Sequence, residues 1–452
     1  MKFNGSAGAT ALVGMPGFVV GASRVVDGEL HLDVETTASM TACPECGVRA
    51  VGHGRRRVKI RDLPISGRPT VLCWAKRIWR CKDPDCATAT WSETSEAVEP
   101  SGLLTVRAGA ELCRVVGEDD WTVALAGRRF GISWPAAMKR VRVYGTPLVD
   151  DPARLETTTA IGVDETTFLH SGRRRRTQYV TGIIDLDRGR LLDVVPGRSG
   201  RVLIDWLFDQ STAWRDQITI AAIDAFRGYA NGLAAALPDA VLVMDHFHTI
   251  RLANRVVDQV RRRTNNVTLG HRGRRHDPLY RIRRIALVGS ERLDQDGWDR
   301  LIAGIDAGDP TGELDAAWAG KELLRNVYKA ADPQAARRAL TAFYTHVADH
   351  DHIGELVTLA RTVDAWETEI LAYHHTARAS NGPTEAVNLL IEKTRRIGHG
   401  FRNFNNYRLR LLLACGAPWN TPPVARLRGR QTTPQRVEPH IRPMKFGGHG
   451  EG

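Results

Sequence analysis

The sequence predicts a multidomain α/β protein, and three observations from different parts of the chain lead to that prediction. Four cysteines near the N-terminus have the spacing of a small metal-binding β module. In the middle of the chain, short β-branched runs alternate with helical segments, as in a mixed sheet covered by helices. Much of the second half is rich in Ala, Leu, Glu and Arg without strand-like alternation, which predicts an all-helical region.

The length and composition are those of a protein with several hydrophobic cores. A chain of 452 residues is long enough for two to four domains. Its hydrophobic fraction of 42% is ordinary for a soluble protein, and no run approaches the roughly 18 apolar residues of a membrane span. The basic region that begins a secretory signal is also thin. We therefore expect a cytoplasmic protein without a membrane partner.

The formal net charge of +12 comes from arginines that recur in blocks. Such blocks often form only a solvated surface, but several of them along one chain indicate a long polyanion as partner. A Gly-rich phosphate loop or a basic amphipathic helix, which would indicate a mononucleotide or a lipid surface, is not found. Nucleic acid is thus the expected partner. The blocks lie at 55–57, 173–176, 261–263 and 272–275.

Residues 1–98 are predicted to form a β-rich lead-in followed by a four-cysteine zinc finger. The ligands would be two cysteine pairs with C-x2-C and C-x4-C spacing, separated by a segment that reads as a β-hairpin. Four thiolates suit the tetrahedral preference of structural zinc, and a reducing cytoplasm argues against disulfides. The remaining cysteines lie in apolar runs and are expected to be core thiols. The four ligands are Cys43, Cys46, Cys81 and Cys86, and the core thiols are Cys73, Cys113 and Cys415.

Residues 99–150 are predicted to form a helix-turn-helix DNA-binding domain. A helix at 121–130, a turn, and a second helix at 134–143 have the layout of this motif, and Ser133 is a good N-cap for the second helix. Cations on the second helix would contact DNA phosphates. A plain helical hairpin is the alternative, because the pattern is degenerate. The expected phosphate contacts are Lys139, Arg140 and Arg142.

Residues 158–263 are predicted to form the first part of a ribonuclease-H-like core. Three strands, a helix at 201–214 and a further strand follow one another, with Asp164 on the first strand and Asp224 on the fourth. That order is typical of this fold, and two aspartates at strand tips make a metal-site hypothesis. Glu165 is the rival of Asp164, although alternation along a strand sends it to the opposite face. The predicted strands are 160–164, 178–185, 191–195, 219–224 and 240–244.

The rest of the chain is predicted to contain an insertion, the end of the core and a tail. Asp245 follows the fifth strand and would either cap the next helix or lie near the site. Residues 264–375 are expected to form an all-helical insertion. Residues 376–415 would complete the core, with Glu385 on the polar side of a helix, although a capping role for this residue is an equal alternative. Residues 416–452 form a basic C-terminal tail.

The order and spacing of the motifs resemble those of DDE transposases of bacterial insertion sequences, specifically the ISL-three group. The likeness extends over nearly the whole chain, and no single motif carries it. The matching features are the two cysteine knuckles around GRRRVKIRDLP, the helix-turn-helix, IGVDE at 161–165, IDAFRGYANG at 223–232, MDHFH at 244–248, and SNGPTEAVN through GFRNFNNYRLR at 380–410.

By this resemblance, Asp164, Asp224 and Glu385 are a catalytic triad that holds Mg²⁺ or Mn²⁺. Asp245 and His248 match an Asp-x-x-His signature beside the triad. The resemblance implies cleavage and strand transfer of double-stranded DNA, at element ends and target, by a homo-oligomer in the bacterial nucleoid. A ribonuclease-H-like nuclease or resolvase, and a zinc-finger regulator with an inactive core, are the alternatives. Further DNA contacts are expected at Arg173, Arg174 and Arg175.

Overall fold

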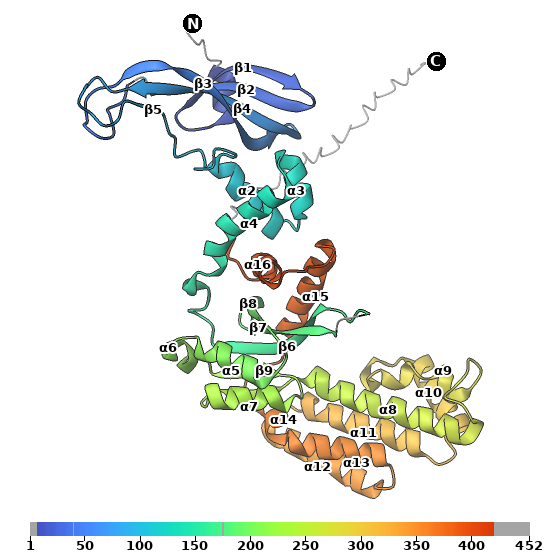
Figure 1. The fold of residues 1–452 in the computed structure, drawn as a ribbon. Coiled ribbons are helices and arrows are strands. Elements are labelled where there is room, and N and C mark those ends of the chain that lie inside the picture. The colour runs from blue at the N-terminus through green and yellow to red at the C-terminus, as the bar shows by residue number, and fades with distance from the viewer. Residues whose placement is uncertain (1–6, 39, 174–175, 420–452) are drawn as a thin grey trace, which may run out of the picture. The chain divides into compact units, whose positions relative to one another are not determined.

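The computed structural model describes residues 7–38, 40–173 and 176–419 (Figure 1). By their contacts, Met1–Pro418 form one compact unit and Trp419–Gly452 a second, and the account below concerns the first. The predicted DNA contacts Arg174 and Arg175, and nearly all of the predicted basic tail, lie outside the described residues.

The N-terminal part is a five-stranded sheet preceded by a short helix, as the β-rich lead-in and hairpin predicted. Strand order is β1-β2-β4-β3, with β5 paired to β4. Asp27 and Gly28 join the first two strands with φ of 50° and 82°, the left-handed pair that a tight hairpin turn requires. The elements are α1 (Ala7–Val13), β1 (Phe18–Val26), β2 (Glu29–Thr36), β3 (Val51–Ile65), β4 (Arg68–Arg80) and β5 (Thr90–Ser92).

Three helices follow, and each begins at a side-chain cap. They are α2 (Val106–Gly117), α3 (Val123–Phe130) and α4 (Trp134–Val149). Thr105, Thr122 and Ser133 each accept a hydrogen bond from a backbone N–H of the first turn. Gly131 ends α3 in the left-handed conformation, so both predicted helices and the turn between them are confirmed, although α4 continues to Val149.

One predicted DNA contact on α4 conflicts with its surroundings. Arg140 is buried, and its guanidinium donates to Glu99 Oε2 at 2.7 Å and to Ser101 Oγ at 2.9 Å. A buried guanidinium paired with a carboxylate is not available to a phosphate, so the prediction for Arg140 was wrong. Lys139 and Arg142 are exposed, and Arg142 donates to Asn406 Oδ1 at 2.9 Å.

A second five-stranded sheet forms the middle of the chain, in the order β10-β9-β6-β7-β8. Strands β6, β7 and β8 are antiparallel neighbours, whereas β9 and β10 run parallel to β6. All five predicted strands are present, but β6 does not end at Asp164, because its pairing with β7 continues. The strands are β6 (Ala160–Leu169), β7 (Gln178–Asp185), β8 (Arg190–Pro196), β9 (Ile220–Ile223) and β10 (Val241–Met244).

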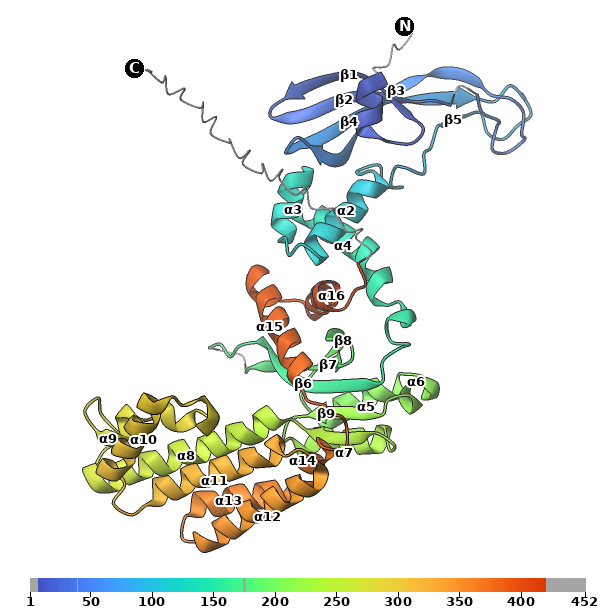
Figure 2. The ribbon, with the colours of Figure 1, turned by 180° about the vertical axis from the view of Figure 1, so that it is seen from behind.

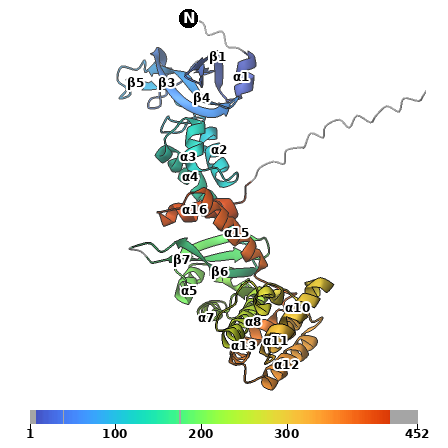
Figure 3. The same ribbon diagram turned by 90° about the vertical axis from the view of Figure 1, so that its right-hand side faces the viewer.

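Helices cover both faces of this sheet (Figures 1 and 3). Helices α5 and α7 pack on one face, and α15 and α16 pack against β6, β7 and β8 on the other. The predicted helix at 201–214 is two helices, because Ser211 caps a new one. The elements are α5 (Gly200–Phe208), α6 (Thr212–Asp216), α7 (Arg227–Ala236), α15 (Gly382–Ile397) and α16 (Phe404–Cys415).

The region between β10 and α15 is helical throughout, as predicted. Helix α8 lies beside α11, and α13 packs against α8 (Figures 1 and 2). The helices share one continuous apolar core with the sheet, from Ile161 to Leu371, and α14 packs on β10. The helices are α8 (His246–Leu269), α9 (Pro278–Arg281), α10 (Gln295–Gly308), α11 (Glu313–Lys329), α12 (Pro333–Asp349), α13 (Gly354–Ala365) and α14 (Glu367–Ala372).

Two details of these helices differ from the periodicity in the sequence. Apolar residues at Phe247, Ile250, Val257 and Val260 have the spacing of a buried helical stripe, which predicts that Phe247 is buried. Phe247 is instead 53% exposed, and His248 is buried. Leu390 of α15 is likewise 44% exposed. Within the described part of the chain, no helix is both long and apolar enough to cross a membrane.

The burial of Arg140 makes a stability prediction. Glu99→Ala would leave a buried guanidinium without its carboxylate, so we expect the free energy of unfolding to fall by about 3 kcal/mol. Lys139→Ala, one position away and exposed, should change it by less than about 0.5 kcal/mol. Urea unfolding of the two variants measures the difference, and equal stabilities would contradict the structural role given to Arg140.

Candidate functional site

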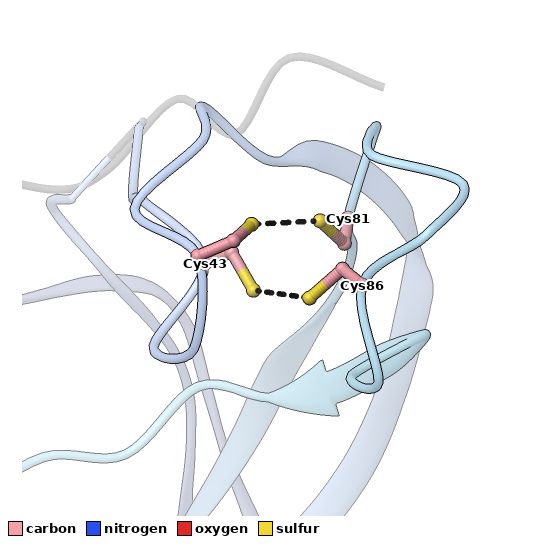
Figure 4. A group of neighbouring side chains, drawn as sticks. Cys43, Cys81 and Cys86 are labelled. Atoms are coloured by element: carbon pink, nitrogen blue, oxygen red, sulfur yellow. Dashed lines mark hydrogen bonds between the residues drawn. The ribbon is translucent and has the colours of Figure 1, made fainter.

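The first site is the group of four cysteines predicted to hold zinc. Cys43 and Cys46 precede β3, and Cys81 and Cys86 follow β4, so the hairpin β3–β4 brings the two pairs together. The Sγ atoms lie 3.7 Å apart for Cys43 and Cys86, and 3.5 Å apart for Cys46 and Cys81. Figure 4 shows the labelled sulfurs turned toward one another. A tetrahedral zinc with bonds of about 2.3 Å separates its sulfurs by about 3.8 Å, so the four sulfurs have the spacing that one structural zinc requires.

The other three cysteines lie apart from this cluster, and all are buried, as expected of core thiols. Within the cluster, the backbone N–H of Cys46 is the main cause that lowers the pKa of Cys43, to about 7. A thiol with a lowered pKa is more readily ionised, and the thiolate is the form that binds metal.

The second site lies where the parallel pairing of β6, β9 and β10 ends. The pairing of β6 with β9 stops at Val163 and Ile223, and that of β10 with β9 stops at Met244 and Ile223. The next residue on each strand is an aspartate: Asp164, Asp224 and Asp245. The parallel register therefore places three aspartates side by side at the C-terminal ends of the parallel strand segments. Strand β6 itself continues beyond Asp164.

Asp164 is held by the helix that carries Glu385. Its Oδ2 accepts a hydrogen bond of 2.6 Å from Asn388 Nδ2 of α15. Burial raises the pKa of Asp164, and the neighbouring charge of Asp224 raises it further, to about 6. The negative charge of Asp224 is thus close enough to oppose ionisation of Asp164.

Asp224 contacts His248, which lies in the first turn of α8. His248 Nδ1 lies 2.6 Å from Asp224 Oδ1 and 3.3 Å from Asp245 Oδ2. Burial alone would lower the pKa of His248, but the two carboxylates outweigh this effect and raise it to about 9. The imidazole is therefore a cation at neutral pH and keeps the Asp224 side chain in place.

Asp245 is fully buried and joins three elements. It caps α8 by accepting from the backbone N–H of Phe247 at 3.1 Å, as predicted for an N-cap. It also accepts from the backbone N–H of Asn381 at 3.0 Å, just before α15. Burial would raise the pKa of Asp245, but the bonds from His248 and Asn381 lower it. Each of its two oxygens thus accepts a backbone hydrogen bond, one at the start of α8 and one just before α15.

Glu385 reaches the same site from the first turn of α15. One oxygen of Glu385, one of Asp245 and one ring nitrogen of His248 lie within 4.8 Å of one another. Among the described residues, no first-turn N–H donates to the Glu385 carboxylate, so the capping alternative is not seen. His248 thus lies between Glu385 on one side and Asp224 on the other.

Two residues of this site carry signals that the sequence interpretation passed over. Asn388, one turn after Glu385, makes the bond to Asp164. Gly162 lets α15 approach β6, because a Cβ there would lie 2.1 Å from Thr384 Oγ1 and 2.6 Å from Asn381 Oδ1. A glycine inside a buried strand marks such an approach and could have indicated it.

Acidic residues elsewhere on this sheet differ from those of the site because they form ion pairs with arginines. Asp185 at the end of β7 pairs with Arg188 and Arg190, and Asp193 of β8 pairs with Arg408 at 2.6 Å. Among the described residues, no arginine or lysine pairs with Asp164, Asp224 or Glu385. Of the cationic side chains that line the cavity, His248 contacts Asp224 directly, whereas Arg198 and Arg251 line it without an ion pair to Asp164 or Asp224.

A cavity of about 520 Å³ opens at these carboxylates and is lined by Asp164, Asp224 and His248. Glu165 lines it as well and forms an ion pair of 3.7 Å with Arg198. Strand alternation was expected to remove Glu165 from the site, but the cavity surrounds the end of the sheet, so both neighbours reach it.

The arrangement is one of clustered oxygen ligands beside an open cavity, and comparisons with known proteins give its class. Residues 161–411 match the family of transposases called ISL3. Residues 39–86 match the zinc-finger of transposase IS204/IS1001/IS1096/IS1165. The first match covers more than half of the chain, so the protein belongs to the ISL3 family of transposases.

Individual relatives agree with this family. The transposase for insertion sequence element IS1001 of Bordetella parapertussis is 25% identical over 397 residues, which cover 85% of this chain and 91% of the relative. The transposase for insertion sequence element IS1557 of Mycobacterium tuberculosis is 34% identical over 107 residues, or 24% of this chain and 23% of the relative.

The cysteine geometry makes a prediction for metal content. Cys46→Ser should lose the zinc, which contributes on the order of 10 kcal/mol to such a module, and should expose the N-terminal sheet to protease while the second sheet stays folded. Cys113→Ala removes a buried thiol outside the cluster and should keep one zinc per chain. Metal analysis with limited proteolysis decides, and zinc retained by the Cys46 variant would be the contrary result.

The raised pKa of Asp164 makes a prediction for stability. Because the folded pKa of about 6 exceeds the ordinary 3.8, ionising Asp164 costs folding free energy above about pH 6, and the cost vanishes below about pH 4. Without added magnesium, Asp164→Asn should therefore be more stable than the parent by on the order of 2 kcal/mol at pH 7.5, with no gain at pH 4.

Asp185→Asn is the matched control, because it removes the charge that pairs with Arg188 and Arg190. This variant should be less stable than the parent at pH 7.5. Denaturant unfolding at the two pH values measures both effects. If Asp164→Asn were less stable than the parent at pH 7.5, the ionised Asp164 carboxylate would not be destabilising the folded protein.

Proposed function

We propose that this transposase binds the ends of its insertion sequence and catalyses magnesium- or manganese-dependent DNA cleavage and strand transfer. The observation that carries the proposal is the position of His248. It lines one cavity with Asp164 and Asp224, and one of its ring nitrogens lies within 4.8 Å of an oxygen of Glu385. Among the described residues, none of these three carboxylates forms an ion pair with a lysine or arginine. Metal ions commonly neutralise clustered carboxylates that have no cationic side chain paired with them.

We further propose that the sheet is the core of a ribonuclease-H-like fold. Its support is the strand order: three antiparallel strands β6, β7 and β8, then β9 and β10 parallel to β6 on the other side. Residues 158–263 and 376–415 would make up this core, and residues 264–375 the insertion. The shared apolar core means that the insertion folds together with the sheet.

The donor set fits magnesium, which prefers carboxylate oxygens to sulfur or imidazole. Asp164, Asp224 and Glu385 would hold the metal, which supplies Lewis acidity for an in-line attack on a phosphodiester. Asn388 orients the Asp164 carboxylate, and His248 orients that of Asp224. Asp245 fixes the start of α15 and hence the position of Glu385.

DNA recognition is proposed to belong to the N-terminal modules, residues 1–98 and 99–150. Structural zinc would stabilise the module of residues 1–98. In the module of residues 99–150, α4 would enter a major groove of the DNA. The exposed Lys139, Arg142 and Arg173 would contact phosphates. Because an element has two ends, we propose that a dimer or larger homo-oligomer acts on the DNA of the bacterial nucleoid.

Three single variants test the catalytic proposal. Asp164→Asn, Asp224→Asn and Glu385→Gln should each reduce cleavage and joining at least a thousandfold, by analogy with other catalytic groups that act as one unit. Binding to the element's ends should stay nearly intact, because an amide keeps the shape and loses only the ligand charge. Gel assays on labelled DNA that spans an element end measure both quantities.

Glu392→Gln is the matched control, two turns further along α15 and paired with Arg395 at 2.7 Å. It should cut and join DNA like the parent. A Glu385→Gln protein that still cuts would remove Glu385 from the site. Cleavage without any joining would instead favour a nuclease or resolvase, and no cleavage by the parent with sequence-specific binding would favour a regulator.

A further inference from the structure

One side of α8 carries polar residues outward from the carboxylate site. His248, Arg251, Arg255 and Gln259 recur every three or four positions, so they follow one line along the helix. The line begins at His248, which contacts Asp224 of the carboxylate site. Arg251, Arg255 and Gln259 are exposed.

A groove follows this line. A cavity of about 730 Å³ lies between α8 and α13 and is lined by Arg255 and Gln259 from the first helix and by Gly354 and Thr358 from the second. Leu252 lines both this cavity and the carboxylate cavity, so the two adjoin along α8. Together they form one groove that starts at the catalytic carboxylates, and we call it the α8 groove.

The free positive charge of the α8 groove comes from two arginines. Among the described residues, no carboxylate lies within ion-pair distance of Arg251 or Arg255. The arginines further along α8 are different: Arg262 pairs with Asp258 at 2.6 Å, and Arg263 pairs with Glu313 and Glu355. Glu355, the acid in the α13 wall, is thus paired with Arg263, whereas Arg251 and Arg255 are left for an outside anion.

The opposite wall also suits an anion. Helix α13 begins at Gly354, and its N-cap residue Ile353 has no side chain that could cap it. Among the described residues, the N–H of Gly354, which lines the groove, therefore has no side-chain cap, whereas the N–H of Glu355 is bonded to its own carboxylate. Free N–H groups at a helix start favour negative charge, which reinforces the two arginines.

We propose that the α8 groove holds the phosphate backbone of the DNA that flanks the element, beyond the phosphate that is cut. This inference rests on the proposed function and adds where that DNA lies. Arginine contacts to phosphates carry no sequence information. They suit flanking DNA, whose sequence changes with every insertion site, better than the element's own repeats. From His248 to Gln259 the helix rises about 16 Å, which matches about five nucleotides at 3.4 Å each.

Equilibrium binding tests the proposal without depending on cleavage. The probes are labelled duplexes that carry the element's end with zero to ten base pairs of flank, bound to the full-length protein with calcium in place of magnesium. Affinity of the parent should rise with flank length and level off near five base pairs. Arg251→Ala combined with Arg255→Ala should abolish that rise and leave affinity for the flankless duplex unchanged.

Salt dependence gives a second measure. Loss of two phosphate contacts should reduce the slope of log affinity against log salt by about 1.8 on the flanked duplex, and should not change it on the flankless one. Arg262→Ala is the matched control, because this arginine is exposed on the same helix but already paired with Asp258. It should behave like the parent on every probe.

The outcomes separate this inference from the proposed function. A double variant that keeps the full rise with flank length, or that weakens binding of the flankless duplex equally, overturns the groove assignment. A parent that shows no rise overturns it too, even if the protein cuts and joins DNA. If the parent fails to cut but shows the rise and the double variant loses it, the groove stands and the catalytic proposal fails.

Discussion

The buried carboxylate of Asp245 is the contact on which the site depends. It caps α8 at the end of β10 and accepts the backbone N–H of Asn381 just before α15, so it joins segments separated by the whole helical region. These two bonds fix the starts of the two helices that carry residues to Asp164 and Asp224 from outside the sheet. His248 follows on α8, and Glu385 with Asn388 follows on α15. A buried, lowered-pKa carboxylate is a strong acceptor, and its burial makes either broken bond costly.

Acidic residues of the second sheet fall into two groups, those paired with arginine and those without an arginine partner among the described residues. Asp185 and Asp193 show how this fold treats acids that only stabilise it, because each is neutralised by arginine. Asp164 and Asp224 receive no such partner among the described residues, and burial, together with the charge of Asp224, raises the pKa of Asp164. Gly162 adds to the same effect, since it brings the start of α15 against β6 and removes a side chain that would have packed there. Strain of this kind is expected where a site is shaped for an absent charge rather than for the folded chain alone.

Local signals in the sequence predicted most of the fold. The caps Ser133 and Asp245, the Asp27–Gly28 turn and the β-branched runs each act through neighbouring residues, so they could be recognised without the fold. The zinc cluster was predictable for the same reason. The wrong predictions concern partners distant in sequence. Arg140 has the exposed-looking pattern of a DNA contact, but Glu99 from before α2 buries it. Strand β6 passes Asp164 because β7 continues to pair with it, and Phe247 is exposed because His248 turns inward to two carboxylates.

The approach of Glu385 to the site was predicted only by resemblance, and the physical reason lies in the helical insertion. Its helices share one apolar core with the sheet, so the insertion is a continuation of the core rather than a tethered addition. Helix α8 belongs to both parts: its first turn holds Asp224 through His248, and its middle turns form the wall opposite α13. A single rigid helix that runs from the carboxylates into the insertion fixes the distance between them. The insertion therefore does two things at once, since it returns the chain to the site at Asn381 and extends the site's surface along α8.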